Sequence, residues 1–580
     1  MVARAVPWRE LGRPVVLDAD SADDDPMTPT DLAVLVQTLQ ESARLTGVAT
    51  PPSPWLPPLP TRVTLGQLEP DPVDDSGQLP LVPFGLCDLP HEQARAAATY
   101  DLDSPGPFGI IGTQRSGRSA TLRAIAASIA RIAGAGDVHL YGVDCGNNAL
   151  LPLINLPHTG AVVARDQLDR LMRLTDRLKT EIGRRQQELA ASGFADIAEQ
   201  RRRSTPDDRL PYLVILLDRW EAFRAAFEQT AGGRLYDDWF QILQEGAAVG
   251  VKTILTADKS ALAGPISTLL EDKLMLRMAD SADFLNIGMA LKDVPQTFPP
   301  GRGFRAEGGR ETQVALLTDD DAGTAQVAAL HDLAARSTPL AEIPFGRRPF
   351  RVDPLPVTID SAAALALGPA ALDDSEILVG AGGDTLGLRA FDAQVHGPGI
   401  LVAGPARSGR STALLTMIES MTSRGWSIVA LAPRRSPLLD LPGTKGVARV
   451  FGADADSNEL TSVLDDLQTP HALVIDDLEL IPEHTPLAET IESRLGQYRD
   501  TGNLVIAAGT TAQLNSMYVG PAAAIKRSRT GLILAAEKYD DAEILGVLLP
   551  TGLPTGSPPG RAIMITPGTW QRIQVAKPAP

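Results

Sequence analysis

Two short glycine-containing segments have the residue types and spacing of a phosphate-binding loop. Gly112 to Ser119 and Gly404 to Ser411 fit the pattern G-x-x-x-x-G-K-[ST], except that arginine (Arg118 and Arg410) replaces the lysine. Each segment follows an apolar run and precedes a stretch of helix-forming residues, which is the strand–loop–helix context that the pattern requires. The sequence therefore predicts a phosphate-binding loop (P-loop) twice.

The chemistry of such a loop follows from its backbone. Glycines let amide groups converge on phosphate oxygens, and the start of the following helix favours the anion. Arginine keeps the positive charge that reaches the β- and γ-phosphates, but it is bulkier than lysine, so we expect nucleotide binding to survive better than catalysis. The expected ATP-binding residues are Gly112, Thr113, Gln114, Arg115, Ser116, Gly117, Arg118, Ser119 and Ala120 in the first loop, and Gly404, Pro405, Ala406, Arg407, Ser408, Gly409, Arg410, Ser411 and Thr412 in the second.

Two apolar runs that end in aspartate supply the acidic group that a P-loop protein needs near Mg²⁺. They are 213–218 and 473–476, and they predict Mg²⁺ sites at Ser119 with Asp218 and at Ser411 with Asp476. The next residue often polarises the attacking water, but Arg219 cannot act as a base near neutral pH. Asp477 is the candidate base of the second copy; the alternative is a carboxylate that only supports the groups around the ion, or one that lies on the surface.

Further paired segments in the same order indicate a duplicated domain. The proline-rich segments 58–60 and 354–356 precede the two loops, and Pro-Gly-Arg segments at 300–302 and 559–561 follow the acidic runs. The first copy is longer by an arginine- and glutamate-rich segment at 165–209, whose apolar spacing predicts a helical arm that the second copy lacks.

Strand and helix patterns alternate within each copy. In the first, apolar strands are predicted at 107–112, 137–143, 212–217 and 251–256, with helices at 119–133, 166–191 and 235–249. This alternation predicts an α/β fold of two tandem RecA-like P-loop NTPase domains, with parallel sheets flanked by helices. We place an N-terminal segment and proline-rich linker at 1–60, with one helix from Thr30 to Leu45, and the two domains at 61–342 and 343–580.

Composition narrows the class of protein. A chain of 580 residues with 44% hydrophobic and 21% charged residues is typical of a globular multidomain protein. A net charge of −18 disfavours nucleic acid as a partner. Cys87 and Cys145 have no metal-type spacing, no apolar run is long enough for a membrane span, and the N-terminus has no apolar signal core, so we expect a cytoplasmic protein.

Several segments resemble one family in combination. The segments 55–65, 81–88, 201–203, 217–220, 300–303 and 474–477 are similar to the C-terminal half of the EccC ATPases of type VII (ESX) secretion, in the FtsK/SpoIIIE superfamily. The resemblance covers almost the whole chain. Residues 1–50 resemble the tail of an upstream ATPase domain, and the chain as a whole resembles the second chain of a split EccC.

The resemblance implies an ATP-binding subunit of a protein-secretion motor that couples nucleotide binding to substrate recognition and export, with weak or partner-dependent hydrolysis. It implies a membrane-anchored EccC-type partner ATPase, location at the inner face of the cell membrane through partners, small helical substrates bound through a C-terminal signal, and homo-oligomeric rings. Arg302 and Arg561 are candidates for arginines that act on a neighbouring subunit's nucleotide, the alternative being local hydrogen bonds. A DNA-translocating FtsK-like ATPase and a scaffold without nucleotide remain alternative functions.

Overall fold

The structure is a computed structural model that describes residues 29–48, 56–69, 77–369, 371–467, 470–553 and 555–579. The described residues fall into two units, those within 1–57 together with 90–93, and those within 58–89 together with 94–580. In the first unit, the predicted helix is present as α1 (Asp31–Leu45), and the Thr30 hydroxyl accepts a hydrogen bond from the Ala33 amide at its start. Residues 1–28 and the linker residues 49–55 lie outside the described residues.

The first domain is built on a ten-stranded sheet in the order β2-β1-β10-β9-β8-β3-β7-β6-β4-β5. Strands β8, β3, β7, β6, β4 and β5 run parallel, and the pairs among β8, β9, β10, β1 and β2 are antiparallel. The strands are β1 (Val82–Leu89), β2 (Ala94–Tyr100), β3 (Phe108–Ile111), β4 (Val138–Asp144), β5 (Thr159–Ala164), β6 (Tyr212–Asp218), β7 (Val251–Ala257), β8 (Asp272–Leu276), β9 (Arg302–Arg305) and β10 (Glu311–Val314).

The second domain repeats this sheet strand for strand, in the order β12-β11-β20-β19-β18-β13-β17-β16-β14-β15. Its strands are β11 (Glu376–Gly382), β12 (Gly387–Asp392), β13 (Gly399–Ala403), β14 (Ser427–Leu431), β15 (Val447–Phe451), β16 (His471–Ile475), β17 (Leu504–Gly509), β18 (Gly531–Leu534), β19 (Arg561–Thr566) and β20 (Thr569–Val575). The identical order confirms the duplication that the paired segments predict.

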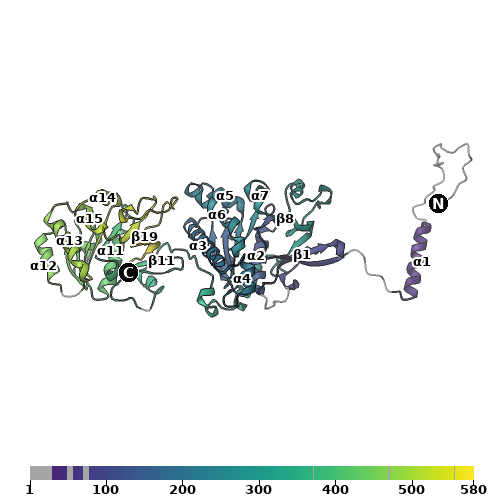
Figure 1. Cartoon of the computed structure of the whole chain (residues 1–580), viewed down its shortest axis with the longest axis horizontal. Helices are drawn as coiled ribbons and strands as arrows, with labels where there is room; N and C mark the ends of the chain where they lie inside the picture. The colour runs from purple at the N-terminus through teal and green to yellow at the C-terminus, as the bar shows by residue number, and fades with distance from the viewer. Residues whose placement is uncertain are drawn as a thin grey trace, which may run out of the picture. The chain divides into compact units, whose positions relative to one another are not determined.

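Helices flank both sheets (Figure 1). Those of the first domain are α2 (Arg118–Ile132), α3 (Leu168–Ser192), α4 (Ile197–Arg203), α5 (Trp220–Phe227), α6 (Arg234–Glu245), α7 (Pro265–Leu269) and α8 (Gly323–Arg336). Those of the second are α9 (Ser361–Leu365), α10 (Ala393–His396), α11 (Arg410–Thr422), α12 (Ser457–Asp465), α13 (Pro486–Gln497), α14 (Thr511–Ser516) and α15 (Gly520–Lys526). Among the described residues, no helix has the length and apolarity that a membrane crossing requires.

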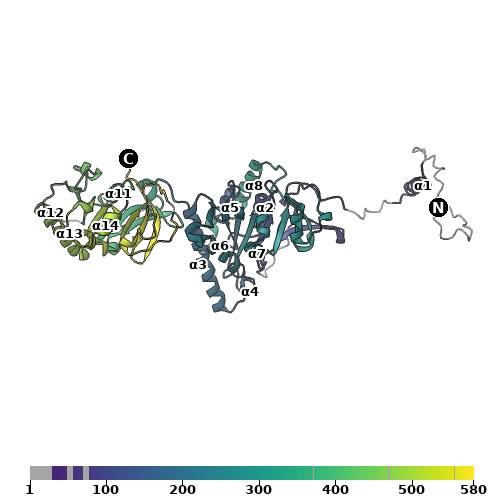
Figure 2. The ribbon, with the colours of Figure 1, turned by 90° about the horizontal axis from the view of Figure 1, so that it is seen from above.

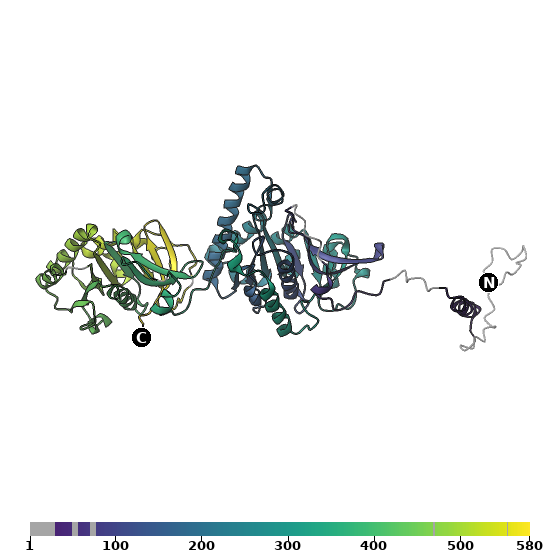
Figure 3. The same cartoon turned by 90° about the horizontal axis from the view of Figure 1, so that it is seen from below.

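The predicted helical arm is the pair α3 and α4, which Figures 2 and 3 show projecting from the first sheet. Leu171, Leu174, Leu178 and Ile182 of α3 are buried, which explains why the segment has a helical apolar period. In the second copy the nine-residue helix α12 stands between β15 and β16 in place of this arm.

The α/β fold is confirmed, but the sheets are mixed rather than parallel throughout. The parallel half contains the buried apolar strands, and β13 shows why these are visible in sequence: Ile400 and Val402 enter one core, while Leu401 and Ala403 enter the other. The antiparallel strands β9 and β10 have four residues each, with arginine, glutamate and glutamine among them. Such short polar strands carry no clear apolar pattern.

Candidate nucleotide-binding sites

Each P-loop follows a central strand of its sheet and lies at the ends of the two strands that neighbour that strand. In the first domain, the Gly112 amide donates to the carbonyl of Ala257, the last residue of β7 (3.0 Å), and the Thr113 amide donates to the Arg277 carbonyl directly after β8 (2.9 Å). Helix α2 starts directly after Gly117, which has φ +113°. In the second domain, α11 starts after Gly409, with φ +106°. The predicted strand–loop–helix unit is present in both copies.

The loops are packed so tightly that a side chain would not fit at their glycines. A Cβ at Gly112 would lie 2.5 Å from Ser116 Oγ, and one at Gly404 would lie 2.5 Å from Ser408 Oγ. A Cβ at Gly117 would lie 3.0 Å from the Gly301 amide nitrogen. Since both serine hydroxyls are buried without a hydrogen-bond partner among the described residues, these loops keep polar groups available for a ligand.

The residues predicted to hold Mg²⁺ meet in both copies. Ser119 Oγ donates to Asp218 Oδ2 at 2.8 Å, and Ser411 Oγ donates to Asp476 Oδ2 at 2.7 Å. Burial raises the pKa of Asp218, while hydrogen bonds from Thr256 and Ser119 act in the opposite direction. A hydroxyl and a carboxylate side by side at the end of a P-loop are oxygen ligands that fit Mg²⁺.

The P-loop arginines are held by carboxylates of their own domain. Arg118 Nη1 lies 3.2 Å from Glu221 Oε1. In the second domain, Arg410 Nη2 lies 3.2 Å from Asp477 Oδ1, and Arg410 Nη1 lies 3.6 Å from Glu479 Oε1. Both arginines are about one-tenth exposed, so each forms its ion pair in a largely desolvated position.

The two copies differ at the residue that follows the metal-site aspartate. Arg219 and Asp477 share a left-handed backbone there, with φ +69° and +54°. Both Asp477 oxygens accept hydrogen bonds from Arg434, at 2.5 and 2.6 Å, and this ion pair raises the pKa of Arg434. Neither Asp477 oxygen is therefore free to hold a water in this state, and its role as a base stays a prediction.

Sequence reasoning missed several residues at these sites. Glu221 and Glu479 each stand three positions after the metal-site aspartate, and this spacing, repeated in both copies, was the available signal. Ser436 Oγ donates to Asp476 Oδ2 at 2.6 Å, and Arg410 donates to Thr510 Oγ1 at 2.9 Å. Ser436 and Thr510 follow strands that neighbour β16 and carry no motif.

A cleft of about 640 Å³ adjoins the first P-loop. Its walls include the cationic side chains Arg118, Arg219, Lys259 and Arg277, together with Glu221, Asp258 and Asp283. The volume is in the range of small-ligand pockets, and a set of cations beside a P-loop suits a polyphosphate.

Arg302 and Arg561 occupy equivalent places and bind the chain segment that leads into their own domain. Arg302 Nη2 donates to the carbonyls of Leu59 (2.8 Å) and Pro60 (3.0 Å), and Nη1 contacts Glu311 at 2.6 Å. Arg561 Nη2 donates to the Pro356 carbonyl at 3.0 Å. Both arginines thus make the local hydrogen bonds that were one of the two roles considered from the sequence. The other role, action on a neighbouring subunit's nucleotide, stays a prediction.

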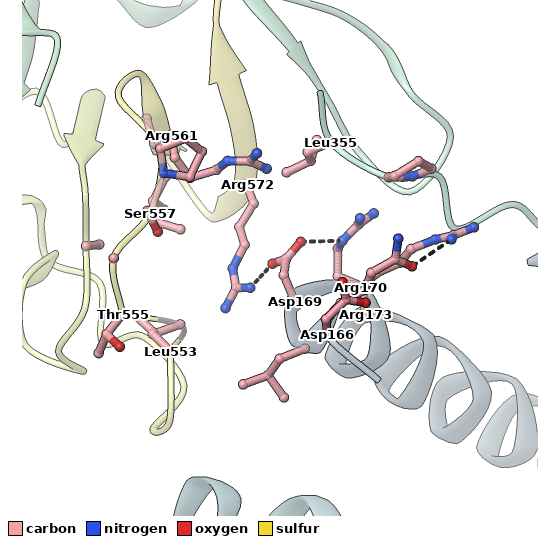
Figure 4. Close-up of a pocket in the computed structure, with 18 residues that line it drawn as sticks. Asp166, Asp169, Arg170, Arg173, Leu355, Leu553, Thr555, Ser557, Arg561 and Arg572 are labelled. Carbon is pink, nitrogen blue, oxygen red and sulfur yellow. Dashed lines mark hydrogen bonds and ion pairs between the residues drawn. The ribbon is translucent and has the colours of Figure 1, made fainter. Parts of the chain in front are cut away.

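A further cavity, of about 290 Å³, lies where α3 meets Leu553, residues 555–563 and β20. Figure 4 shows Asp169 of α3 between Arg173 and Arg572, with an ion pair to each. Burial lowers the pKa of Arg572 to about 10. Arg173 also donates to the Asp353 carbonyl at 2.7 Å, so this end of α3 holds the segment that leads into the second domain.

Known proteins with similar sequences belong to a family of P-loop ATPases. Residues 83–297 match the model of the FtsK/SpoIIIE family. The chain is 27% identical over 558 residues to the ESX-4 secretion system protein EccC4 of Mycobacterium tuberculosis, a match that covers 90% of this chain and 42% of that protein. The chain carries an FtsK/SpoIIIE domain and resembles the EccC ATPases. It spans about two fifths of the length of this relative.

Solved structures show the same tandem fold. EssC (ATPases 2 and 3) from Geobacillus thermodenitrificans matches with a TM-score of 0.67 and 23% identity, covering 90% of this chain and all of that one. EccC (ATPases 2 and 3) of Thermomonospora curvata, solved in complex with a signal sequence peptide, matches with a TM-score of 0.53 and 24% identity, covering 90% and 97%. The resemblance to EccC that the sequence motifs indicate is thus confirmed, and the P-loop family implies nucleotide binding, usually with Mg²⁺.

Proposed function

We propose that this chain is an ATP-binding, FtsK/SpoIIIE-type subunit of a type VII (ESX) protein-secretion motor. The observation that carries the proposal is the pair formed by a P-loop serine and a buried aspartate, at 2.8 Å in one domain and 2.7 Å in the other. The assignment to ESX protein secretion, as distinct from another ATP-driven process, is based on the name of the relative EccC4. We propose that nucleotide binding at these two sites is coupled to recognition and export of a substrate.

Each site can bind Mg²⁺ and ATP with its own residues. The P-loop amides and the starts of α2 and α11 would hold the phosphates, and Ser119 with Asp218, or Ser411 with Asp476, would hold the ion. Bound Mg²⁺ would neutralise charge on the phosphate oxygens. Arg118 and Arg410 provide the cation that lysine usually provides, in a planar and bulkier form.

Hydrolysis by the isolated chain is proposed to be weak or dependent on a partner. The residue after the metal-site aspartate is an arginine in the first domain, which cannot accept a proton from water. In the second domain it is Asp477, whose oxygens are bound to Arg434 and Arg410. With an arginine or an ion-paired aspartate at this position, neither site has there the free carboxylate that commonly orients the attacking water.

The proposed partners are those that the resemblance to the EccC ATPases implies. We propose a membrane-anchored EccC-type ATPase as partner, assembly in homo-oligomeric rings, and a cytoplasmic position at the inner face of the membrane through these partners. We also propose that small helical substrates dock through a C-terminal signal; the complex of the Thermomonospora protein with a signal sequence peptide supports the binding of a substrate.

A DNA-translocating ATPase is the second candidate, because the matched family model is that of FtsK/SpoIIIE. The net charge of −18 argues against it, since an acidic surface repels the DNA backbone. ATP hydrolysis that DNA stimulates and that salt suppresses would favour this second function.

The steady-state rate of ATP hydrolysis by the purified chain tests the proposal, with Asp477→Asn as the control variant. We expect little or no turnover from protein that binds ATP. A clear rate that disappears in Asp477→Asn would show that the second domain is a working motor site, and would contradict weak hydrolysis. Failure of the chain to bind ATP at all would instead favour a scaffold that has lost nucleotide.

A further inference from the structure

Glu221 and Glu479 occupy equivalent positions beside the two P-loop arginines. Each is the third residue after the metal-site aspartate, and each has one oxygen, Oε1, next to an arginine: 3.2 Å from Arg118 and 3.6 Å from Arg410. A carboxylate–arginine contact therefore occurs at this position in both copies, and in the second copy Asp477 also contacts the arginine, at 3.2 Å.

The second carboxylate is fixed by its surroundings. Glu479 Oε1 accepts hydrogen bonds from the amide and hydroxyl of Thr510, at 3.0 and 2.8 Å, and only 4% of the side chain is exposed. A Cβ at Gly509 would lie 2.4 Å from Glu479 Oε2, so the glycine is needed to admit the carboxylate. The site is thus built to keep this negative charge at the arginine.

The first carboxylate lies between two cations. Glu221 Oε1 contacts Arg118 at 3.2 Å and Arg219 at 3.3 Å, and its side chain is 19% exposed on the cleft beside the P-loop. In both glutamates Oε2 is buried with no hydrogen-bond partner among the described residues. A buried oxygen without a hydrogen-bond partner costs free energy, so each carboxylate is less stable here than it would be with both oxygens hydrogen-bonded.

We propose that Glu221 and Glu479 are positioning residues that hold the P-loop arginine as an internal counter-ion, which the nucleotide's β- and γ-phosphates must replace. Each carboxylate competes with the phosphates for the same guanidinium. Each therefore lowers the ATP affinity of its own site. This inference rests on the proposed nucleotide binding.

The test is a titration of the full chain with ATP and with AMP in the presence of Mg²⁺, by calorimetry, fitted with two sites. Glu221→Gln is expected to tighten ATP binding at one site by roughly three- to tenfold, and Glu479→Gln at the other, as loss of a charged competitor predicts. The unmutated site is the internal reference. AMP affinity is expected to be unchanged, because AMP has no β- or γ-phosphate for the arginine.

A double-mutant cycle separates this role from a merely structural one. If the glutamate acts through the arginine, Glu221→Gln gives no gain in an Arg118→Ala background, and Glu479→Gln gives none in Arg410→Ala. Matched controls are Glu228→Gln and Glu459→Gln, which remove carboxylates from exposed ion pairs away from the loops and should leave both affinities unchanged.

Equal or weaker ATP binding by the folded glutamine variants would overturn the proposal, as would a gain that persists without the arginine. If a glutamine variant does not fold, Glu→Asp at the same position is the substitute, because it keeps the charge but moves it away from the arginine by one methylene. A gain in ATP affinity smaller than that expected for glutamine is predicted. An unchanged ATP affinity would overturn the proposal. If the wild-type chain and every variant fail to bind ATP, the proposed function itself fails. Binding by wild type without a gain in the variants overturns only the role of the glutamates.

Discussion

The amide nitrogen of Gly301 donates a hydrogen bond to the carbonyl oxygen of Ser116 at 2.9 Å, joining the Pro-Gly-Arg turn to the first P-loop. Gly560 and Ser408 repeat this bond at 2.9 Å in the second domain. The P-loop and the turn also pack closely at Gly117 of the P-loop, because a Cβ there would press against the Gly301 amide of the turn. The conformation of each P-loop is therefore tied to the turn that follows it.

The arginine of the same turn holds the segment that leads into the domain. Arg302 donates to the Pro60 carbonyl at 3.0 Å, and Arg561 donates to the Pro356 carbonyl at 3.0 Å. Each domain thus has a chain of contacts from its P-loop, through the Pro-Gly-Arg turn, to its Pro-Leu-Pro segment. The paired segments that reveal the duplication in the sequence are the parts of this contact chain.

We expect Gly117→Ala to weaken ATP binding at the first site by at least about tenfold and to destabilise the protein by about 1–3 kcal/mol. At φ +113° a Cβ is strained, and it would also meet the Gly301 amide nitrogen at 3.0 Å. Calorimetric titration and thermal unfolding measure the two effects. Gly183→Ala in α3 is the matched control, since its Cβ would meet nothing within 4 Å, and unchanged ATP binding by Gly117→Ala would contradict the account.

Arg302→Ala is expected to lower the free energy of unfolding by about 2–3 kcal/mol, because it leaves Glu311 and two carbonyls without their buried partner. Limited proteolysis should cut residues 56–65 faster in this variant than in wild type. Arg310→Ala, which removes an exposed arginine nearby, serves as the control. Equal proteolysis rates would show that Arg302 does not hold this segment.

Ser119→Ala and Ser411→Ala are expected to reduce the dependence of ATP binding on Mg²⁺, each at its own site. Each substitution removes the hydroxyl that pairs with Asp218 or Asp476 and would contact the ion. ATP titrations with Mg²⁺ and with a chelator measure this dependence. An Mg²⁺ effect as large as in wild type would show that the ion is held elsewhere.

Acid should destabilise the first domain partly through His139. Burial lowers the pKa of His139 to about 4, and its Nε2 contacts the Arg347 carbonyl at 3.0 Å. Because the unfolded state binds this proton more tightly, near pH 6.5, stability is lost as pH falls from about 6.5 to about 4. His139→Gln should make that loss smaller by about 3 kcal/mol, measured by denaturant unfolding at several pH values. An identical pH dependence would contradict this prediction.

The parts of the fold that could be predicted from the sequence are those built from continuous apolar strands and glycine-containing loops. The runs that end in Asp218 and Asp476 predicted the parallel half of each sheet, because strands buried on both faces are continuously apolar, and they predicted which carboxylates lie beside the P-loop serines. The antiparallel half was not predicted, since β9 and β10 are too short and too polar to show a period.

Side-chain partners could not be read from the sequence. Arg302 has the loop position of an arginine that reaches outward, but its burial and its bonds to residues 59 and 60 depend on a chain segment more than 200 residues away. The contact of Arg410 with Glu479 likewise depends on how β16 and the P-loop approach each other. Only the repeated spacing of Glu221 and Glu479 after aspartate was visible in advance.

The number of ATP molecules bound per chain tests the central claim most directly. Equilibrium titration of the purified chain with ATP and Mg²⁺ should give two sites, and Gly117→Ala and Gly409→Ala should each weaken one of them so that it stays unfilled at ATP concentrations that saturate the other. A stoichiometry of two that falls to one in each variant is the predicted result. A wild-type chain that binds no ATP, or one whose stoichiometry neither variant changes, would contradict the assignment of both P-loops as nucleotide-binding sites.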